Sequence, residues 1–302
     1  MHQPSTLPTA PRIAPAGRYA FTALIAANLL LAFGPWMVRI ADVGPVSSAF
    51  WRLALAAPFL LLLARLGTKE RAAPSIALIA TVIVGGLFFA ADLAAWHVGI
   101  GMTKLANATL FGNMSSFLFV IYGFLIVRTL PRRAQVAALA LAAAGTALLL
   151  GSSYEVSREH FAGDLFAMLA GLFYTFYLVA VDKARRTMAP MPVLAIATAA
   201  GTLPLLGFAL LLGEQVMPSD WTPLVLLSLG SQLIGQGLLV YAIGHLSPVV
   251  VGLGLLTQPA AAAAIGWFAY REALRPADAL GAVLICAALV LIRLPEKHRA
   301  SD

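Results

Sequence analysis

The sequence is short of charge. Asp, Glu, Lys and Arg make up only 11% of its 302 residues, whereas they make up about 25% of ordinary globular proteins. Hydrophobic residues make up 61%, so the chain lacks the polar groups that would cover its surface in water. This balance excludes a soluble protein and predicts an all-α integral membrane protein that uses the bilayer as its solvent.

Cysteine and catalytic motifs are also scarce. Cys286 is the single cysteine, which excludes an intrachain disulfide, a CxxC redox motif and a thiolate metal cage. The sequence has no HExxH, no GxSxG elbow, no paired intramembrane aspartates and no P-loop, which disfavours a membrane-embedded enzyme and direct use of ATP. His97 and His245 have no second ligand at metal spacing. We therefore expect no enzymatic activity, no metal and no cofactor.

Basic residues give a net charge of +7, but they lie in short clusters between apolar runs. Nucleic-acid binding needs Lys and Arg gathered on one solvated face, so we expect no nucleic-acid partner. Clusters of this kind beside membrane helices favour contact with anionic lipids. Membrane lipids and a small-molecule substrate are the partners we predict, and the sequence leaves the oligomeric state open, a monomer included.

Charged residues mark the ends of the apolar runs, and a spanning helix needs roughly 20 apolar residues. From Trp221 to Tyr270 no charged residue occurs, and as one helix this run would be roughly 75 Å long. It must therefore fold back, and Gly244 and Pro248 mark the expected break. We predict ten membrane helices, over 19–38, 45–64, 72–96, 105–127, 134–150, 165–181, 191–212, two within 221–270, and 277–294.

Both tails are predicted to lie in the cytoplasm. Residues 1–17 contain four prolines, which excludes a continuous helix and predicts a disordered tail, and residues 296–302 form the second tail. Ten helices put both termini on one side of the membrane. With that side inside, fourteen Lys and Arg residues fall in inside segments and five outside. The positive-inside rule therefore predicts cytoplasmic termini, in a bacterial-type inner membrane.

The two halves of the chain repeat one pattern. A shift of 144 residues brings Pro74 onto Pro218, Gly86 onto Gly230 and Phe124 onto Phe268, and it keeps the spacing of helices and loops. Because five helices per half is an odd number, the second half must enter the membrane from the opposite side. Such an inverted-topology repeat is characteristic of secondary transporters, which bind substrate near the midplane between the halves.

The motifs also resemble a known family. The stretch from Trp36 to Leu62 resembles the first hairpin of the EamA family of the drug/metabolite transporter (DMT) superfamily, and the stretch from Ser247 to Ala282 resembles its ninth and tenth helices. The resemblance implies two EamA repeats, at 18–152 and 162–295, and a ten-helix metabolite exporter, YddG-like amino-acid exporters included. Ser115 and its neighbour depart from it, because a proline is usual there.

Two charges lie within predicted spans. Arg52 is eight residues into the second span and Asp92 lies in the third, and a charge at the membrane centre costs about 2.5–3.5 kcal/mol on insertion scales. We predict that Arg52 and Asp92 form an ion pair, either as a purely structural link or with Asp92 also holding a substrate ammonium group or a proton.

Other polar and aromatic side chains share helical faces with this pair. Each is either a ligand contact or an interhelical hydrogen bond or interfacial aromatic. The predicted substrate-binding residues are Asn28, Trp36, Phe88, Asp92, Trp96, His97, Asn107, Tyr174, Tyr177, Gln232, Gln236 and Gln258. In the ninth span Gly252, Gly254 and Pro259 predict a hinge, because proline removes a backbone hydrogen bond; tight helix packing is the alternative for its small residues.

These features favour a secondary transporter that works by alternating access. The first span has no acid, which disfavours cation/proton antiport of the kind used by small multidrug transporters. Arg52, Lys104 and Lys183 are too few buried cations for sugar phosphates or nucleotide sugars. We therefore expect export of neutral or zwitterionic metabolites, most of all amino acids, aromatic and hydrophobic ones included, facilitative or proton-coupled. Other metabolites or drugs remain the alternative substrates, and a channel the alternative function.

Overall fold

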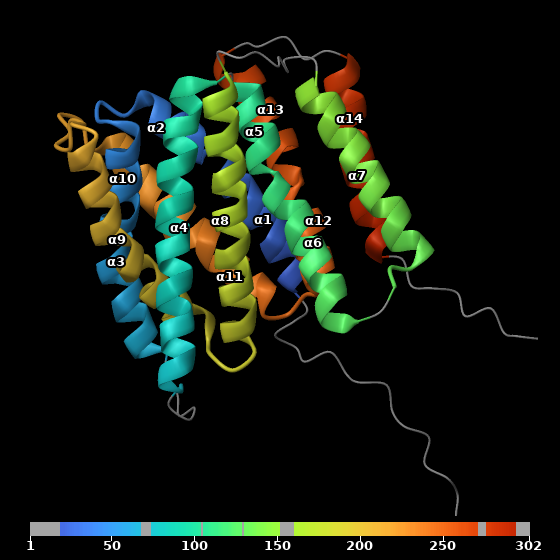
Figure 1. Ribbon diagram of the computed structural model, residues 1–302, viewed down its shortest axis with the longest axis horizontal. Coiled ribbons are helices and arrows are strands. Elements are labelled where there is room, and N and C mark those ends of the chain that lie inside the picture. The colour runs from blue at the N-terminus through green and yellow to red at the C-terminus, as the bar shows by residue number, and fades with distance from the viewer. Residues whose placement is uncertain are drawn as a thin grey trace, which may run out of the picture.

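The structure is a computed structural model that describes residues 19–67, 74–103, 105–128, 130–151, 160–270 and 276–293. Within these ranges the regular structure is helical and no strand occurs. Figure 1 shows the helices as a bundle of rods that run in roughly the same direction. The elements are α1 (Ala20–Ala32), α2 (Gly34–Ile40), α3 (Pro45–Leu66), α4 (Ile76–Met102), α5 (Leu105–Gly112), α6 (Met114–Val127), α7 (Arg133–Gly151), α8 (Phe161–Arg185), α9 (Pro190–Leu211), α10 (Thr222–Leu226), the π-helix η2 (Leu227–Gly235), α11 (Gln236–Ile243), α12 (Pro248–Leu255), α13 (Thr257–Tyr270) and α14 (Pro276–Arg293).

The helices have the length and composition of membrane spans. Among the described residues, seven helical segments are long and apolar enough to cross a membrane, and three shorter apolar helices, Met114–Val127, Arg133–Leu149 and Pro276–Ile292, accompany them. Large apolar side chains face outward, Leu203 and Phe268 among them, as contact with lipid requires. The chain is thus an integral membrane protein. The predicted break of the long apolar run is also confirmed, because α11 ends at Ile243 and α12 begins at Pro248.

Three rods are interrupted. The breaks fall at Phe33 between α1 and α2, at Asn113 between α5 and α6, and at Leu256 between α12 and α13. Pro35 and Pro259 follow two of these breaks by two and three residues, and neither proline can donate the backbone hydrogen bond that would continue the helix. Proline thus explains the breaks at Phe33 and Leu256.

The break between α5 and α6 forms without proline. The backbone amide of Ser116 donates to the Asn113 carbonyl, three residues back, so the Gly112 carbonyl loses its usual helical partner. The Ser115 hydroxyl donates to that carbonyl instead, at 3.0 Å. A serine side chain therefore satisfies the carbonyl group that the break releases.

Helices of the first half pack against helices of the second. The principal contacts pair α4 with α8 and α9, α3 with α9 and η2, α6 with α12, α7 with α14, α5 with α8, and α1 with η2, α11 and α13. In Figure 1 the early blue and green rods accordingly lie among the late yellow and orange ones. The two halves form one body rather than two adjacent domains.

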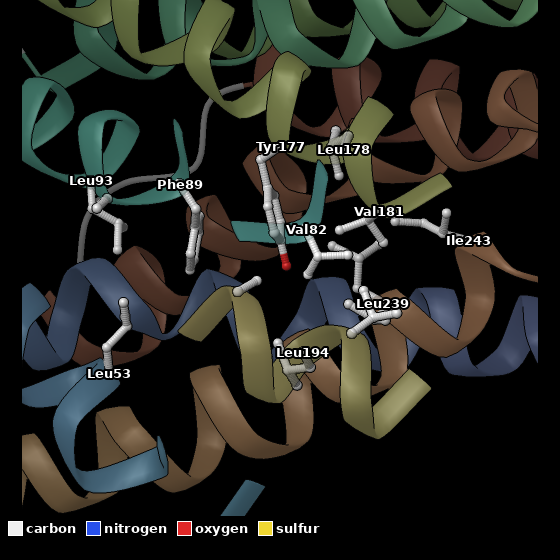
Figure 2. Close-up of a cluster of buried hydrophobic side chains, with 14 of the residues drawn as sticks. Leu53, Val82, Phe89, Leu93, Tyr177, Leu178, Val181, Leu194, Leu239 and Ile243 are labelled. Carbon is white, nitrogen blue, oxygen red and sulfur yellow. The ribbon is translucent and has the colours of Figure 1, made fainter. Parts of the chain in front are cut away.

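The principal core lies between α3, α4, α8, α9 and α11. Figure 2 shows Phe89 and Tyr177 side by side there, with Leu53, Leu194 and Leu239 around them. The Phe89 and Tyr177 rings stack with centroids 4.6 Å apart, a geometry that aromatic pairs favour. This stack joins α4 to α8, and Phe89 also lines the cavity described in the next section.

A loop clamp joins the segment before α3 to the segment after α9. The Glu214 carboxylate accepts hydrogen bonds from the backbone amides of Val46 at 3.2 Å and Ser47 at 2.7 Å. These amides belong to the first turn of α3, where a negative charge is favourable. Asp42 accepts in turn from the Ser219 amide at 2.6 Å, and this hydrogen bond lowers the pKa of the Asp42 carboxyl.

The clamp predicts the effect of Glu214→Ala. The substitution leaves two amides of the first turn of α3 without their partner, so we expect a loss of about 1 kcal/mol of stability. Thermal unfolding of the purified protein in detergent measures it, with Gln215→Ala as the matched control, since the Gln215 side chain bonds only to the carbonyl of Met217 in its own loop. Equal melting temperatures for the two variants would refute a capping role.

Candidate substrate cavity

A cavity of about 240 Å³ lies at the helix breaks. Its walls come from α1 and α2, α3, α4, α5 and α6, α8, α11, and α12 and α13, so both halves of the chain contribute. The polar and aromatic residues in its lining are Arg52, Phe89, Asp92, Trp96, His97, Thr109, Asn113, Ser115, Ser116, Tyr174, Gln236 and Gln258. Two opposite charges and several aromatic rings therefore face one small space.

A second compartment of about 420 Å³ adjoins the first. Trp96 and His97 line both compartments, and Trp36 lines the second only. Its lining continues to Val43 and Pro45 at the start of α3 and is mostly apolar. The polar cavity thus extends, through an apolar vestibule, toward the end of the bundle that carries the loop clamp.

Arg52 is held by uncharged groups. Its Nε donates to Gln232 Oε1 at 3.0 Å, and Gln232 Nε2 donates to Thr198 Oγ1 at 2.9 Å. The guanidinium carbon lies 5.7 Å from the centroid of the Phe89 ring, within the range of a cation–π contact. A glutamine carbonyl and an aromatic face fix the guanidinium without neutralising it.

The predicted ion pair does not form in this structure. Among the described salt bridges, with nitrogen and oxygen within 4.0 Å, none joins Arg52 to Asp92, although the two charges are close enough to interact electrostatically. Asp92 lies ten residues before the end of α4 at Met102, about 15 Å along the helix. It is therefore deeper than the sequence suggested, because α4 continues beyond the apolar limit at Trp96.

Two buried acceptors face the cavity without a partner. His97 Nδ1 lies against the carbonyl oxygen of Leu93. Because a carbonyl only accepts, we assign the ring proton to Nδ1, which leaves Nε2 as an acceptor. His97 Nε2 and Gln236 Oε1 are both buried and have no hydrogen-bond partner among the described residues. Each lines the cavity.

The structure divides the predicted binding residues into two groups. Asp92, Trp96, His97, Tyr174, Gln236 and Gln258 line the cavity, together with the predicted hinge residue Pro259. Trp36 lines the vestibule. The cavity lining does not include Asn28, Phe88, Tyr177, Gln232, Gly252 or Gly254. The side chain of Asn107 lies outside the described part of the structure.

The residues outside the cavity have structural contacts. Asn28 donates to the Gly254 carbonyl at 2.8 Å and accepts from Gln258 at 3.0 Å, so it is an interhelical bridge. Phe88 packs on Phe176, with centroids 5.0 Å apart, and it is the next residue, Phe89, that reaches the cavity. Tyr177 is fully buried in the stack on Phe89.

The two predicted hinge glycines are sites of close packing. A Cβ at Gly252 would lie 2.7 Å from the carbonyl oxygen of Ser116 on α6, and one at Gly254 would lie 2.4 Å from Leu24 on α1. Only a residue without a side chain permits such approach. The break itself lies beyond them at Leu256, and a hinge motion there stays a prediction.

Helical spacing alone did not identify several lining residues. Phe89, Thr109 and Ser115 line the cavity, and the spacing of polar and aromatic residues in the sequence does not point to Phe89 or Thr109. Ser115 was visible as a departure from the family pattern, at the position that the 144-residue shift aligns with Pro259. That alignment is the signal that points to a second helix break.

The opposite end of the bundle is closed by packing and polar contacts. Tyr122 on α6 donates to Asp182 on α8 at 2.9 Å, and Arg186 forms a salt bridge with the same carboxylate at 3.0 Å. The hydrogen bond from Arg186 to Asp182 raises the pKa of the Arg186 guanidinium. A Cβ at Gly123 would lie 3.1 Å from Val249 on α12, so α6 and α12 touch closely here. We call this set the lower closure.

Comparisons with known proteins agree with this architecture. Residues 161–294 match the EamA-like transporter family. The second half of this chain is therefore similar to the EamA-like transporter family. Members of the family are transporters, not enzymes, and the match suggests transport of small molecules for this chain.

A solved crystal structure of another protein has the same fold. It superposes with a TM-score of 0.75 over 93% of this chain and 98% of its own, at 20% sequence identity. At that identity the likeness shows the fold alone. No curated protein matches the chain.

The lower closure predicts the effect of Tyr122→Phe. Removing the hydroxyl breaks the hydrogen bond between α6 and α8, so the cavity should become more accessible from that end. Maleimide labelling of a cavity cysteine, Ser116→Cys in a Cys286→Ala background, measures this from each side of the membrane. We expect labelling from the lower side to rise several-fold. Unchanged labelling in Tyr122→Phe would contradict the closure.

Proposed function

We propose that this protein is a secondary transporter built from two inverted five-helix repeats, 18–152 and 162–295, with ten membrane helices. The pattern of helix contacts supports the repeat. The first rod of the first half, α1, contacts η2 and α11 of the second half, and the first rod of the second half, α8, likewise contacts α4 of the first half. In the same way α1 contacts α12 and α13, and α8 contacts α5 and α6. Exchange of the two halves thus keeps these principal contacts.

The broken helices support the same arrangement. Asn113 precedes α6 and Leu256 precedes α13, so the fourth rod of each half is interrupted at nearly the same place. Discontinuous helices at corresponding positions in two repeats are typical of secondary transporters, and they mark the substrate site. The cavity lies at both breaks.

Alternating access would use the two ends of the bundle in turn. The cavity continues to the loop clamp through the vestibule, and the lower closure blocks the other end. With both termini in the cytoplasm of a bacterial-type cell, the vestibule faces outward, as the positive-inside rule predicts. The resting state proposed here is therefore outward-facing, and release of the lower closure would admit substrate from the cytoplasm.

The single observation that carries the substrate class is one cavity with two separate, opposite charges. Arg52 offers a guanidinium for a carboxylate and Asp92 a carboxylate for an ammonium group, and Trp96 and Tyr174 offer aromatic surface. The volume of about 240 Å³ is below the range of about 300–1,000 Å³ for drug-sized ligands. Amino acids, aromatic and hydrophobic ones included, combine these properties.

Whether transport is coupled to protons depends on what the Asp92 carboxylate binds. Because no direct salt bridge to Arg52 neutralises it, the carboxylate is available either to a substrate ammonium group or to a proton. The first case gives a facilitative exporter that follows its substrate gradient, and the second gives proton-coupled export. Other neutral metabolites or drugs are the alternative cargo if amino acids are not carried.

Counterflow in proteoliposomes tests the function. With labelled phenylalanine, leucine or alanine as substrates, we expect exchange well above that of empty liposomes. Exchange that is independent of a pH gradient favours the facilitative mechanism, and a several-fold stimulation by the gradient favours proton coupling. Absence of exchange for every amino acid would reject the substrate class and leave the transporter fold in place.

The role of Arg52 is tested by Gln232→Glu. The new carboxylate replaces the amide oxygen 3.0 Å from Arg52 Nε and would neutralise the guanidinium, so we expect amino-acid exchange to fall roughly tenfold or more. Folding should be retained, as size-exclusion chromatography and melting temperature can establish. Gln135→Glu is the matched control, because Gln135 is half-buried, lies outside the cavity lining and accepts only from the Arg132 amide, which a glutamate also accepts. Normal exchange in Gln232→Glu would exclude Arg52 as the carboxylate partner.

A further inference from the structure

The cavity contains more acceptors than one ion pair would need. Asp92 contributes a carboxylate, His97 contributes Nε2 and Gln236 contributes Oε1, and all three line the same space. Buried polar atoms in proteins almost always have partners. Here the acceptors of His97 and Gln236 have none among the described residues, which indicates that a ligand supplies the donors.

These three acceptors lie in one neighbourhood. Tyr174 lies close to both Gln236 and Asp92, and Arg52 lies within electrostatic range of both Asp92 and His97. Arg52 itself is turned toward Gln232 by the hydrogen bond at its Nε. The carboxylate-binding and donor-binding groups of the cavity are therefore separate but close enough for one small ligand to reach both.

The chemistry of the acceptors selects their ligand. A primary ammonium group has three N–H donors and no acceptor, whereas a trimethylammonium group has no donor at all. A neutral imidazole nitrogen and an amide oxygen would gain nothing from the methylated cation beyond its charge. Because unpaired buried acceptors are unfavourable, the cavity should reject ligands that leave them unpaired.

We propose that Asp92, His97 and Gln236 form a three-acceptor site that binds the primary ammonium group of the substrate and discriminates against N-methylated analogues. This inference builds on the proposed transport of amino acids and adds a specificity that the charges of Arg52 and Asp92 alone would not provide. Asp92 supplies the negative charge, and His97 and Gln236 each accept one further N–H hydrogen bond from the ammonium group.

Binding to the purified full-length protein in nanodiscs tests the proposal. The ligands are phenylalanine, N-methylphenylalanine and N,N,N-trimethylphenylalanine, measured by calorimetry. For the wild type we expect roughly tenfold weaker binding or more for the first methyl group, because one charge-assisted hydrogen bond is lost. In Gln236→Leu and in His97→Phe, phenylalanine should bind roughly tenfold more weakly and its preference over N-methylphenylalanine should largely vanish.

The chain offers matched controls for both variants. His245 has the same local contact as His97, with Nδ1 against the carbonyl four residues back, at Tyr241, but it is exposed. Gln215 lies in an exposed loop contact. His245→Phe and Gln215→Leu should therefore leave binding unchanged. Gln236→Glu keeps the acceptors and adds charge, so it should retain or tighten ammonium binding even if Gln236→Leu does not fold.

The outcomes separate this inference from the proposed function. Variants that weaken phenylalanine and N-methylphenylalanine equally, with the preference intact, would overturn the three-acceptor site while amino-acid transport stands. The same series built on phenethylamine, which lacks the carboxylate, tests the site alone. If the wild type binds phenethylamine with the expected preference and binds no amino acid, the ammonium site stands and the proposed substrate class falls. Binding of neither series would overturn both.

Discussion

Every backbone group released inside a membrane must find a partner within the protein, because the hydrocarbon offers none. The helix breaks of this protein obey that constraint. At the Asn113 break the Ser115 hydroxyl donates to the carbonyl of Gly112. Near the Leu256 break the side chains of Asn28 and Thr257 donate to the carbonyl of Gly254. The polar side chains beside the cavity are thus needed for folding before they are available for transport.

The buried charges also need partners within the protein. A direct ion pair between Arg52 and Asp92 would lower the free-energy cost of burying both charges. It would also leave neither charge available to bind the carboxylate or the ammonium group of a zwitterion. The structure instead fixes Arg52 with the neutral Gln232 and the face of Phe89. This arrangement keeps two separated charges in a space that substrate can enter, at an energetic cost that the surrounding helix contacts must offset.

Much of this architecture was predictable from the sequence. The charged residues marked the helix that begins at Pro45, and glycine and proline marked the break between Ile243 and Pro248. Pro259 marked the ninth span as the place of a bend, and a break lies there at Leu256. Individual side chains were less predictable. Gln232 and Gln236 are four residues apart and were expected on one face, but Gln232 lies in the π-helix η2 and bonds Arg52 while Gln236 lines the cavity. A local widening of the helix leaves no trace in simple periodicity.

Phe89, which the sequence patterns did not identify, connects the cavity to the core. Phe89 lines the cavity and supports Arg52 on one side, and it stacks on Tyr177 of the core on the other. A change in the position of Arg52 must therefore pass into the contact between α4 and α8, the most extensive helix contact in the described chain. Because such packed contacts favour discrete arrangements over gradual deformation, we expect binding at the cavity to change the relative position of the two halves.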